Sequence, residues 1–410
     1  MYRPRNPRAS TLWHCAQHHS RARDTADIRI VVTTASSQSA PIQIDALTGI
    51  RGFAAFWVAF HHLREYRPDG LLGMPVFSEL SHGGWLAVDL FFVLSGFIMM
   101  HVHGEEFRSF SIERARRFIG LRFIRVYPAH AVVLLLHVPL FFVAMAFGMG
   151  VNRDAFSARS FVLSAFMLNG WGFPGSEGWN VPSWSVSSEW FAYLLFPVLA
   201  LLVWRVQRRR TAALVMIAIL GTVTLIGGSY SNWKQFMLPG WGTLVRVTSE
   251  FALGCLTYHF YRQPIGRRLA EGIAQTAFAG LLAVSIFAVS HVYDALSLVF
   301  FVLLVMGLSQ ADGPFARLLR TRPVIYLGRI SYSAYIVHSL VLAVYARIIG
   351  RITGGDAVVE FAIVVMYAAL VILASHLLYT LVEDPARRWL RGPLVERPAR
   401  TPPPVAEAER

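Results

Sequence analysis

Residues 83–100 read GGWLAVDLFFVLSGFIMM, an apolar run of nearly membrane-spanning length with one charged residue, Asp89. A helix needs about 20 consecutive apolar residues to cross a bilayer. Several such runs predict an all-α, polytopic membrane protein, and Gly96 in this run favours close helix packing. We expect ten spans, at residues 46–63, 84–102, 126–148, 183–204, 212–228, 241–260, 271–290, 294–309, 327–349 and 357–382. The apolar segment 157–170 is shorter, which predicts an interfacial or re-entrant helix.

The composition of the chain agrees with a membrane protein. Of its 410 residues 55% are hydrophobic and 15% charged, against about 25% charged in a typical soluble domain. These values exclude a disordered protein and disfavour an ordinary soluble enzyme. The two cysteines, Cys15 and Cys255, are too few for a disulfide framework or a Cys-rich zinc site, and no histidine spacing indicates a metal.

The net charge of +14 is distributed unevenly across the expected topology. With the N-terminus inside, 29 of the 38 Lys and Arg residues fall in cytosolic segments and eight in outer ones, while Arg51 lies within the first span. This asymmetry predicts an even number of spans with both termini in the cytosol. It also explains the positive charge without a nucleic-acid partner. The expected location is the inner (plasma) membrane, as a multi-pass protein.

Three regions follow from the pattern of apolar and polar residues. Residues 1–43 are rich in Arg, Ser and Thr and predict a disordered tail. Residues 44–388 form the expected membrane domain. Residues 389–410 are rich in Pro, Arg and Glu and predict a second disordered tail.

The first span carries two ionisable residues, Arg51 and His62, eleven residues apart. This spacing is close to three helical turns, so both side chains share a helix face, with an axial separation of roughly 16 Å. One interpretation is a snorkelling Arg with an interfacial His. The other is an anion anchor near the cytosol and a base further outward. A charge at the bilayer centre costs about 2.5–3.5 kcal/mol, which favours a functional role.

Two further motifs place charges in or beside the spans. Asp89 needs a buried partner such as an Arg from another helix, and a structural ion pair is one interpretation. Arg122 and Arg125 are three residues apart and share a helix face. Paired guanidinium groups bind phosphates well. The alternative is that they set the topology or bind anionic lipid.

The segment PSWSVSSEW, residues 182–190, leads into the fourth span. Ser185 or Ser187 could cap the helix, with Glu189 in its first turn. Alternatively, Glu189 lies in a polar cavity near the outer face, where it orients a histidine or binds a sugar hydroxyl. In the ninth span Tyr335 and His338 are three residues apart and share a face, as packing groups or as part of a site.

Together these motifs resemble the acyltransferase-3 family of integral membrane acyltransferases over roughly residues 44–388. The matching segments are IDALTGIRGFAAFWVAFHH, GGWLAVDLFFVLSGF, RFIRVYPAH, PSWSVSSEWFAYLLFP, LGRISYSAYIVH and VEDP. The resemblance implies ten membrane helices that transfer an acyl group, usually acetyl from acetyl-coenzyme A, to carbohydrate hydroxyls. It implies a stand-alone enzyme similar to exopolysaccharide O-acetyltransferases.

The resemblance also implies roles for the charged motifs. The family's pattern of Arg, ten residues and His falls on Arg51 and His62, and its cytosolic arginine motif falls on Arg122 and Arg125. We expect the three arginines to bind the phosphates of acyl-coenzyme A from the cytosol. His62 is then the general base on the acceptor hydroxyl, because its unperturbed pKa lies near neutrality.

The family's Ser-Trp-Ser…Glu motif falls on Trp184, Ser185 and Glu189. Many members carry a second acid after this Glu, where this chain has Trp190. Glu189 is expected to hold or polarise His62, or to position the sugar. The reaction requires no metal, and both direct transfer and an acyl-enzyme remain open.

Two other functions remain compatible with the residues alone. One is a carrier or flippase for lipid-linked sugars, and the other is a scaffold of a polysaccharide export complex. The expected partners are the lipid bilayer, acyl-coenzyme A, a carbohydrate acceptor and polysaccharide biosynthesis proteins.

Overall fold

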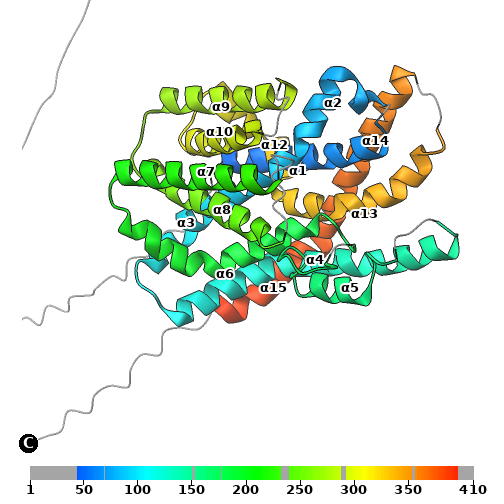
Figure 1. Cartoon of the computed structure of the whole chain (residues 1–410), viewed down its shortest axis with the longest axis horizontal. Helices are drawn as coiled ribbons and strands as arrows, with labels where there is room; N and C mark the ends of the chain where they lie inside the picture. Colours follow the sequence, from blue (N-terminus) through cyan, green and yellow to red (C-terminus); the bar gives the residue numbers. More distant parts are fainter. Residues whose placement is uncertain are drawn as a thin grey trace, which may run out of the picture. The chain divides into compact units, whose positions relative to one another are not determined.

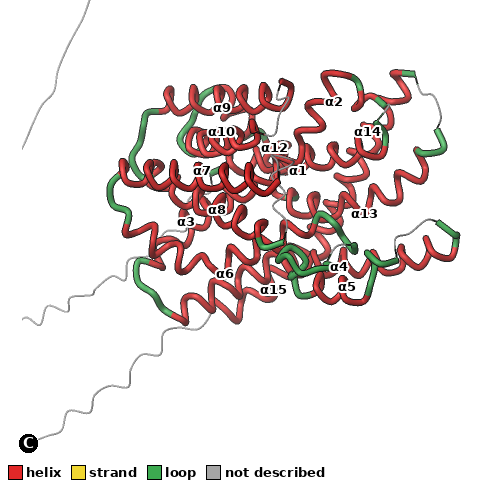
Figure 2. Tube along the Cα trace, viewed as in Figure 1, coloured by secondary structure: helices red, strands yellow, loops and turns green. Residues whose placement is uncertain are grey.

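The computed structural model describes residues 44–68, 70–149, 153–176, 178–231, 240–287, 292–352 and 356–395. Within these ranges every regular element is a helix and there is no strand (Figure 2). The prediction of an all-α protein is confirmed. The expected tail over residues 1–43 lies outside the described residues.

Most of the helices are labelled in Figure 1, and the described part of the chain lies in one compact unit that spans residues 41–410. In chain order they are α1 (Asp45–Tyr66), η1 (Leu71–Gly73), α2 (Pro75–His82), η2 (Gly83–Leu86), α3 (Ala87–His103), η3 (Gly104–Phe107), α4 (Ile112–Ala146), α5 (Ala158–Ala165), α6 (Ser183–Arg205), α7 (Arg209–Ser231), α8 (Gly242–Tyr261), α9 (Arg267–Phe287), α10 (Val292–Leu308), α11 (Pro314–Leu319), α12 (Arg322–Arg329), α13 (Ser331–Ile349), α14 (Ala357–Leu378), η4 (Tyr379–Glu383) and α15 (Asp384–Val395).

Seven helical stretches in the described ranges are long and apolar enough to cross a membrane, which confirms a polytopic membrane protein. They are Phe77–Phe107, Ile112–Ala146, Ser183–Arg205, Arg209–Ile226, Arg267–Phe287, Ser331–Ile349 and Ala357–Gly392. The apolar helix Ala295–Leu308 is shorter. The expected spans 46–63 and 241–260 coincide with α1 and α8, whose ionisable residues lower their hydropathy. The count of ten spans and the cytosolic termini stay predictions.

Several boundaries differ from those expected. The third span belongs to a 35-residue helix, α4, that begins at Ile112 and holds Pro128 and Pro139 in its interior. Interior proline is tolerated in membrane helices because neighbouring groups satisfy the freed backbone. The ninth span is divided at Ile330 into α12 and α13. The tail expected from residue 389 is helical as far as Val395. Segment 157–170 contains an eight-residue helix, α5, which is too short to span.

The centre of the fold is built from helices that pack directly on one another. α3 packs along α8, α9 packs along α10, and α1 contacts α3, α12 and α13 (Figure 1). The close approach of α3 and α8 depends on glycine. A Cβ atom on Gly96 would lie 1.9 Å from the Phe251 carbonyl oxygen, and one on Gly254 would lie 2.0 Å from the Val93 carbonyl oxygen. The small residue expected at position 96 therefore allows the two backbones to touch.

We predict that Gly254→Ala destabilises the protein, because the added methyl forces α3 and α8 apart. Overpacking of this kind costs about 1–3 kcal/mol. The control is Gly272→Ala in α9, where a Cβ would meet no atom within 4 Å and helix propensity changes by about 1 kcal/mol in the favourable direction. The measurement is the thermal unfolding midpoint of detergent-solubilised protein. Equal midpoints for the two variants would contradict the proposed backbone contact.

Candidate functional site

Four of the predicted site residues line one small cavity of about 90 Å³. Arg51 comes from α1, Arg122 and Arg125 come from α4, and Glu189 comes from α6. We call this the arginine cavity. Its remaining lining residues are Leu94, Ser95, Ile98, Met99, Val126, Tyr193 and Tyr332. Residues from separate motifs, more than a hundred positions apart, therefore form one polar space.

The three arginines differ in how their charges are compensated. Arg125 forms an ion pair with the buried carboxylate of Glu383, which also accepts a hydrogen bond of 2.7 Å from the Ser333 hydroxyl. Arg51 forms no hydrogen bond or ion pair with any residue that the structure describes. Among the described residues, Arg122 has a polar contact only with His103, 3.5 Å from Nη2 to Nε2, and its Nε atom has no partner there. Two positive charges of the cavity thus lack a paired carboxylate.

Glu189 lies on the wall of this cavity and is held by two hydroxyl groups. It accepts a hydrogen bond of 2.6 Å from Tyr193 Oη and another from Ser95 Oγ. Because α6 begins at Ser183, Glu189 lies in the second turn rather than the first. The residue before the helix, Pro182, provides no side-chain cap. The capping interpretation of this segment is therefore wrong.

The serines of the same segment join α6 to other elements. Ser185 Oγ donates 3.1 Å to the Pro182 carbonyl and lies 2.6 Å from the hydroxyl of Tyr335 on α13. Ser187 Oγ donates 2.6 Å to the Met167 carbonyl. Trp184 is partly buried against the apolar core and does not line the arginine cavity. These contacts fix where α6 begins.

Asp89 belongs to a separate buried ion cluster between α3 and α8. It pairs with Arg246, whose Nε also contacts Glu250 Oε1 at 3.0 Å. All three residues are buried. The expected Arg partner from another helix is confirmed. Arg246, which falls within the expected span 241–260, is an internal counter-ion, and Glu250 was not singled out from the sequence.

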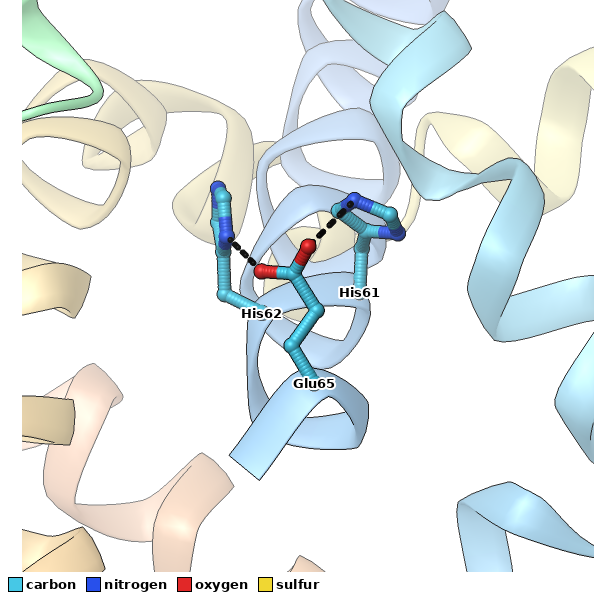
Figure 3. A group of neighbouring side chains, drawn as sticks. All are labelled: His61, His62 and Glu65. Atoms are coloured by element: carbon cyan, nitrogen blue, oxygen red, sulfur yellow. Dashed lines mark hydrogen bonds and ion pairs between the residues drawn. The ribbon is translucent and has the colours of Figure 1, made fainter. Parts of the chain in front are cut away.

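His62 lies at the other end of α1, roughly 16 Å along the helix axis from Arg51. Its Nδ1 lies 2.9 Å from Glu65 Oε2 (Figure 3). The His62 ring also stacks on that of His338, with centroids 5.2 Å apart and an interplanar angle of 18°. The expectation that Glu189 holds His62 is corrected, because Glu189 lies beside Arg51, three helical turns away. The carboxylate at His62 is Glu65, recognisable in sequence by its i,i+3 spacing.

His338 is fully buried on α13. Its Nδ1 lies 2.6 Å from the Tyr335 carbonyl oxygen. A carbonyl oxygen can only accept, so Nδ1 carries the hydrogen and Nε2 bears a lone pair. Nε2 has no hydrogen-bond partner in the part of the chain that the structure describes. The shared face expected for Tyr335 and His338 is present, with ring centroids 5.8 Å apart.

One group in the described ranges has the composition of a metal site. Ligand atoms of His61, His62 and Glu65 all lie within 4.8 Å of one another (Figure 3). Imidazole nitrogen and carboxylate oxygen are ligands that zinc accepts. The spacing of the histidines alone did not reveal this group. His61 and His62 are adjacent in the sequence, and the carboxylate comes from Glu65, three residues after His62. That the reaction proceeds without a metal stays a prediction.

Comparison with known proteins adds to this geometry. A family model for an acyltransferase domain matches residues 44–380. Acyltransferase MdmB of Streptomyces mycarofaciens is 27% identical over 392 residues, which covers 87% of this chain and 95% of MdmB. Putative peptidoglycan O-acetyltransferase YrhL of Bacillus subtilis (strain 168) is 23% identical over 381 residues, 84% of this chain and 55% of YrhL. No solved structure matches.

The family model and the relatives agree on the chemistry. The model covers most of the chain, and the two relatives align along more than four-fifths of it under names that denote acyl transfer. The chain is therefore an enzyme that transfers acyl groups, embedded in a membrane by several apolar helices. It belongs to the acyltransferase-3 family.

Proposed function

We propose that the enzyme moves an acetyl group from acetyl-coenzyme A to a hydroxyl of a carbohydrate, such as an exopolysaccharide or a lipid-linked glycan. The observation that carries the proposal is the arrangement along α1. Arg51, in a cavity with unpaired positive charge, lies at one end, and the histidine–carboxylate pair His62–Glu65 lies at the other. The name of the relative YrhL, an O-acetyltransferase of a glycan, supports a hydroxyl acceptor.

The arginine cavity suits the phosphate groups of the donor. Arg51 and Arg122 have no paired carboxylate, and guanidinium groups form strong, charge-assisted hydrogen bonds to phosphate. Arg125 contributes less, because Glu383 already neutralises it. Glu189 lines the same cavity as Arg51 and Arg122, so its proposed role is to balance part of their positive charge. The donor is cytosolic, which favours an inner-membrane enzyme with this cavity toward the cytosol.

The proposed reaction balances without another reactant. The flexible arm of the donor extends from the arginine cavity toward His62. His62 takes the proton from the acceptor hydroxyl, whose oxygen forms a bond to the thioester carbonyl carbon. The carbon–sulfur bond then breaks, and the proton passes from His62 to the departing thiolate. The products are the acetyl ester and coenzyme A.

The role of His62 as the base can be tested by removing its imidazole ring. His62→Ala should lower acetyl transfer by about 100-fold or more, the scale of general-base catalysis. The measurement is the acetyl content of cell-surface polysaccharide at matched membrane levels of the protein. His376→Ala is a control, because His376 lies near the end of α14, outside the arginine cavity. Equal acetylation by the His62 variant and the wild type would remove His62 as the base and favour a carrier or scaffold.

Binding of the donor phosphates can be tested at Arg51 and Arg122. Arg51→Ala and Arg122→Ala should each raise the KM for acetyl-coenzyme A by about 10- to 100-fold, since a hydrogen bond to a charged group contributes about 1.5–3 kcal/mol. The matched control is Arg267→Ala, which removes the same charge from a side chain that is 80% exposed. An unchanged KM in both cavity variants would exclude the arginine cavity as the phosphate site.

Arg125 should behave differently from Arg51 and Arg122. Arg125→Ala should reduce the stability of the folded protein, because the buried carboxylate of Glu383 loses its counter-ion. Breaking a buried ion pair costs about 3–5 kcal/mol. The double variant Arg125→Ala with Glu383→Gln should recover much of the thermal unfolding midpoint. If the single variant is as stable as the wild type, the ion pair does not stabilise the junction of α4 with η4.

A further inference from the structure

We propose that Glu65 is a positioning residue for His62, which fixes the imidazole so that Nε2 is the atom that takes the proton of the acceptor. The inference rests on the proposed function and adds to it a residue outside every family motif quoted above. Glu65 and His62 belong to the last two turns of α1, three residues apart. They therefore lie on the same helix face.

The hydrogen bond between them decides which nitrogen is free. His62 Nδ1 lies 2.9 Å from Glu65 Oε2. An ionised carboxylate can only accept, so Nδ1 carries the hydrogen and the neutral ring has its lone pair on Nε2. Nε2 has no hydrogen bond to any residue that the structure describes. The His62 side chain is 30% exposed, so a hydroxyl group can reach this atom.

The surroundings of the pair restrict both groups. His338, which is fully buried, stacks on the His62 ring at 5.2 Å. The second oxygen of Glu65 faces His61 Nε2 at 3.8 Å (Figure 3). His61 Nδ1 in turn lies 3.2 Å from the Ser81 carbonyl oxygen. The titratable groups around His62 are thus Glu65, His61 and His338, with the ring of His82 6.0 Å from that of His61.

A second pair shows that spacing alone does not make such a site. His103 and Glu106 are also three residues apart, with Nδ1 and Oε1 at 3.1 Å. However, the Nε2 atom of His103 is directed at Arg122, 3.5 Å away. His62, by contrast, has a carboxylate at Nδ1 and an accessible lone pair on Nε2. That combination is what a general base requires.

The carboxylate also stabilises the charge that forms during the reaction. His62 becomes an imidazolium when it takes the proton, and an adjacent carboxylate favours this state and its orientation. Glu65→Ala should therefore lower kcat about 10- to 100-fold while the KM for acetyl-coenzyme A is unchanged, because the arginine cavity is distant. Glu65→Gln keeps an acceptor atom and should give an intermediate kcat with an unchanged KM.

The experiment uses the full-length protein in membranes, with radiolabelled acetyl-coenzyme A as the donor and envelope polysaccharide from the deletion strain as the acceptor. The matched control is Glu105→Gln. Glu105 also forms an i,i+3 pair, with Arg108, and its side chain is 57% exposed against 53% for Glu65. This control should leave kcat and KM unchanged. If Glu65→Ala does not accumulate in membranes, Glu65→Gln decides by a lowered kcat at an unchanged KM.

Three other outcomes would each contradict a different part of the proposed site. A wild-type kcat in the Glu65 variants, with His62→Ala inactive, would remove Glu65 as a positioning residue and leave the proposed function standing. Full transfer by His62→Ala would overturn the proposed function itself. Loss of wild-type activity with a chelator and its recovery with zinc would show that His61, His62 and Glu65 hold a metal, which would replace the positioning role.

Discussion

Every charge buried among apolar helices needs a partner, and this requirement organises the interior of the molecule. An isolated charge in such surroundings costs several kcal/mol. The buried acids of the bundle accordingly meet cations across helices, as Asp89 meets Arg246 and Glu383 meets Arg125. Against this background Arg51 and Arg122 stand out, because neither forms an ion pair with a described carboxylate, although Glu189 lies on the wall of the same cavity. A site that is short of negative charge is suited to an anionic ligand, and acyl transfer from coenzyme A supplies one.

Packing and chemistry meet at the contact between α3 and α8. Gly96 and Gly254 bring the two backbones together, which places Asp89 of α3 within reach of Arg246 of α8. The neighbour of Gly96, Ser95, is directed instead at Glu189 of α6. One short stretch of α3 therefore closes the helix contact and also forms a wall of the arginine cavity. A change that separates α3 from α8 would disturb both the ion cluster and the cavity.

The positions of side chains within one helix could be predicted from the sequence better than the contacts between helices. The shared face of Arg51 and His62 follows from 3.6 residues per turn alone, and the need of Asp89 for an Arg follows from the cost of burial. Glu189 was expected to hold His62 or to position the sugar, but the structure places it in the cavity with Arg51, and this placement depends on how α6 packs against α3 and α4. Glu383 is 258 residues from Arg125, a distance at which no local pattern operates. Glu65 and Glu250, by contrast, had a local signal, the i,i+3 spacing from His62 and the i,i+4 spacing from Arg246.

The two halves of the proposed site are connected by a single rigid element. α1 holds Arg51 near one end and His62 near the other, and a helix fixes both the separation, roughly 16 Å, and the common face. A shift of one residue between them would rotate the base by about 100° away from the arginine side. The donor must therefore bind with its phosphates at one end and present its thioester at the other, which favours a ligand with a long, flexible arm. In this arrangement the helix itself sets the distance between donor anchoring and proton transfer, and the surrounding helices supply the counter-charges that keep it in place.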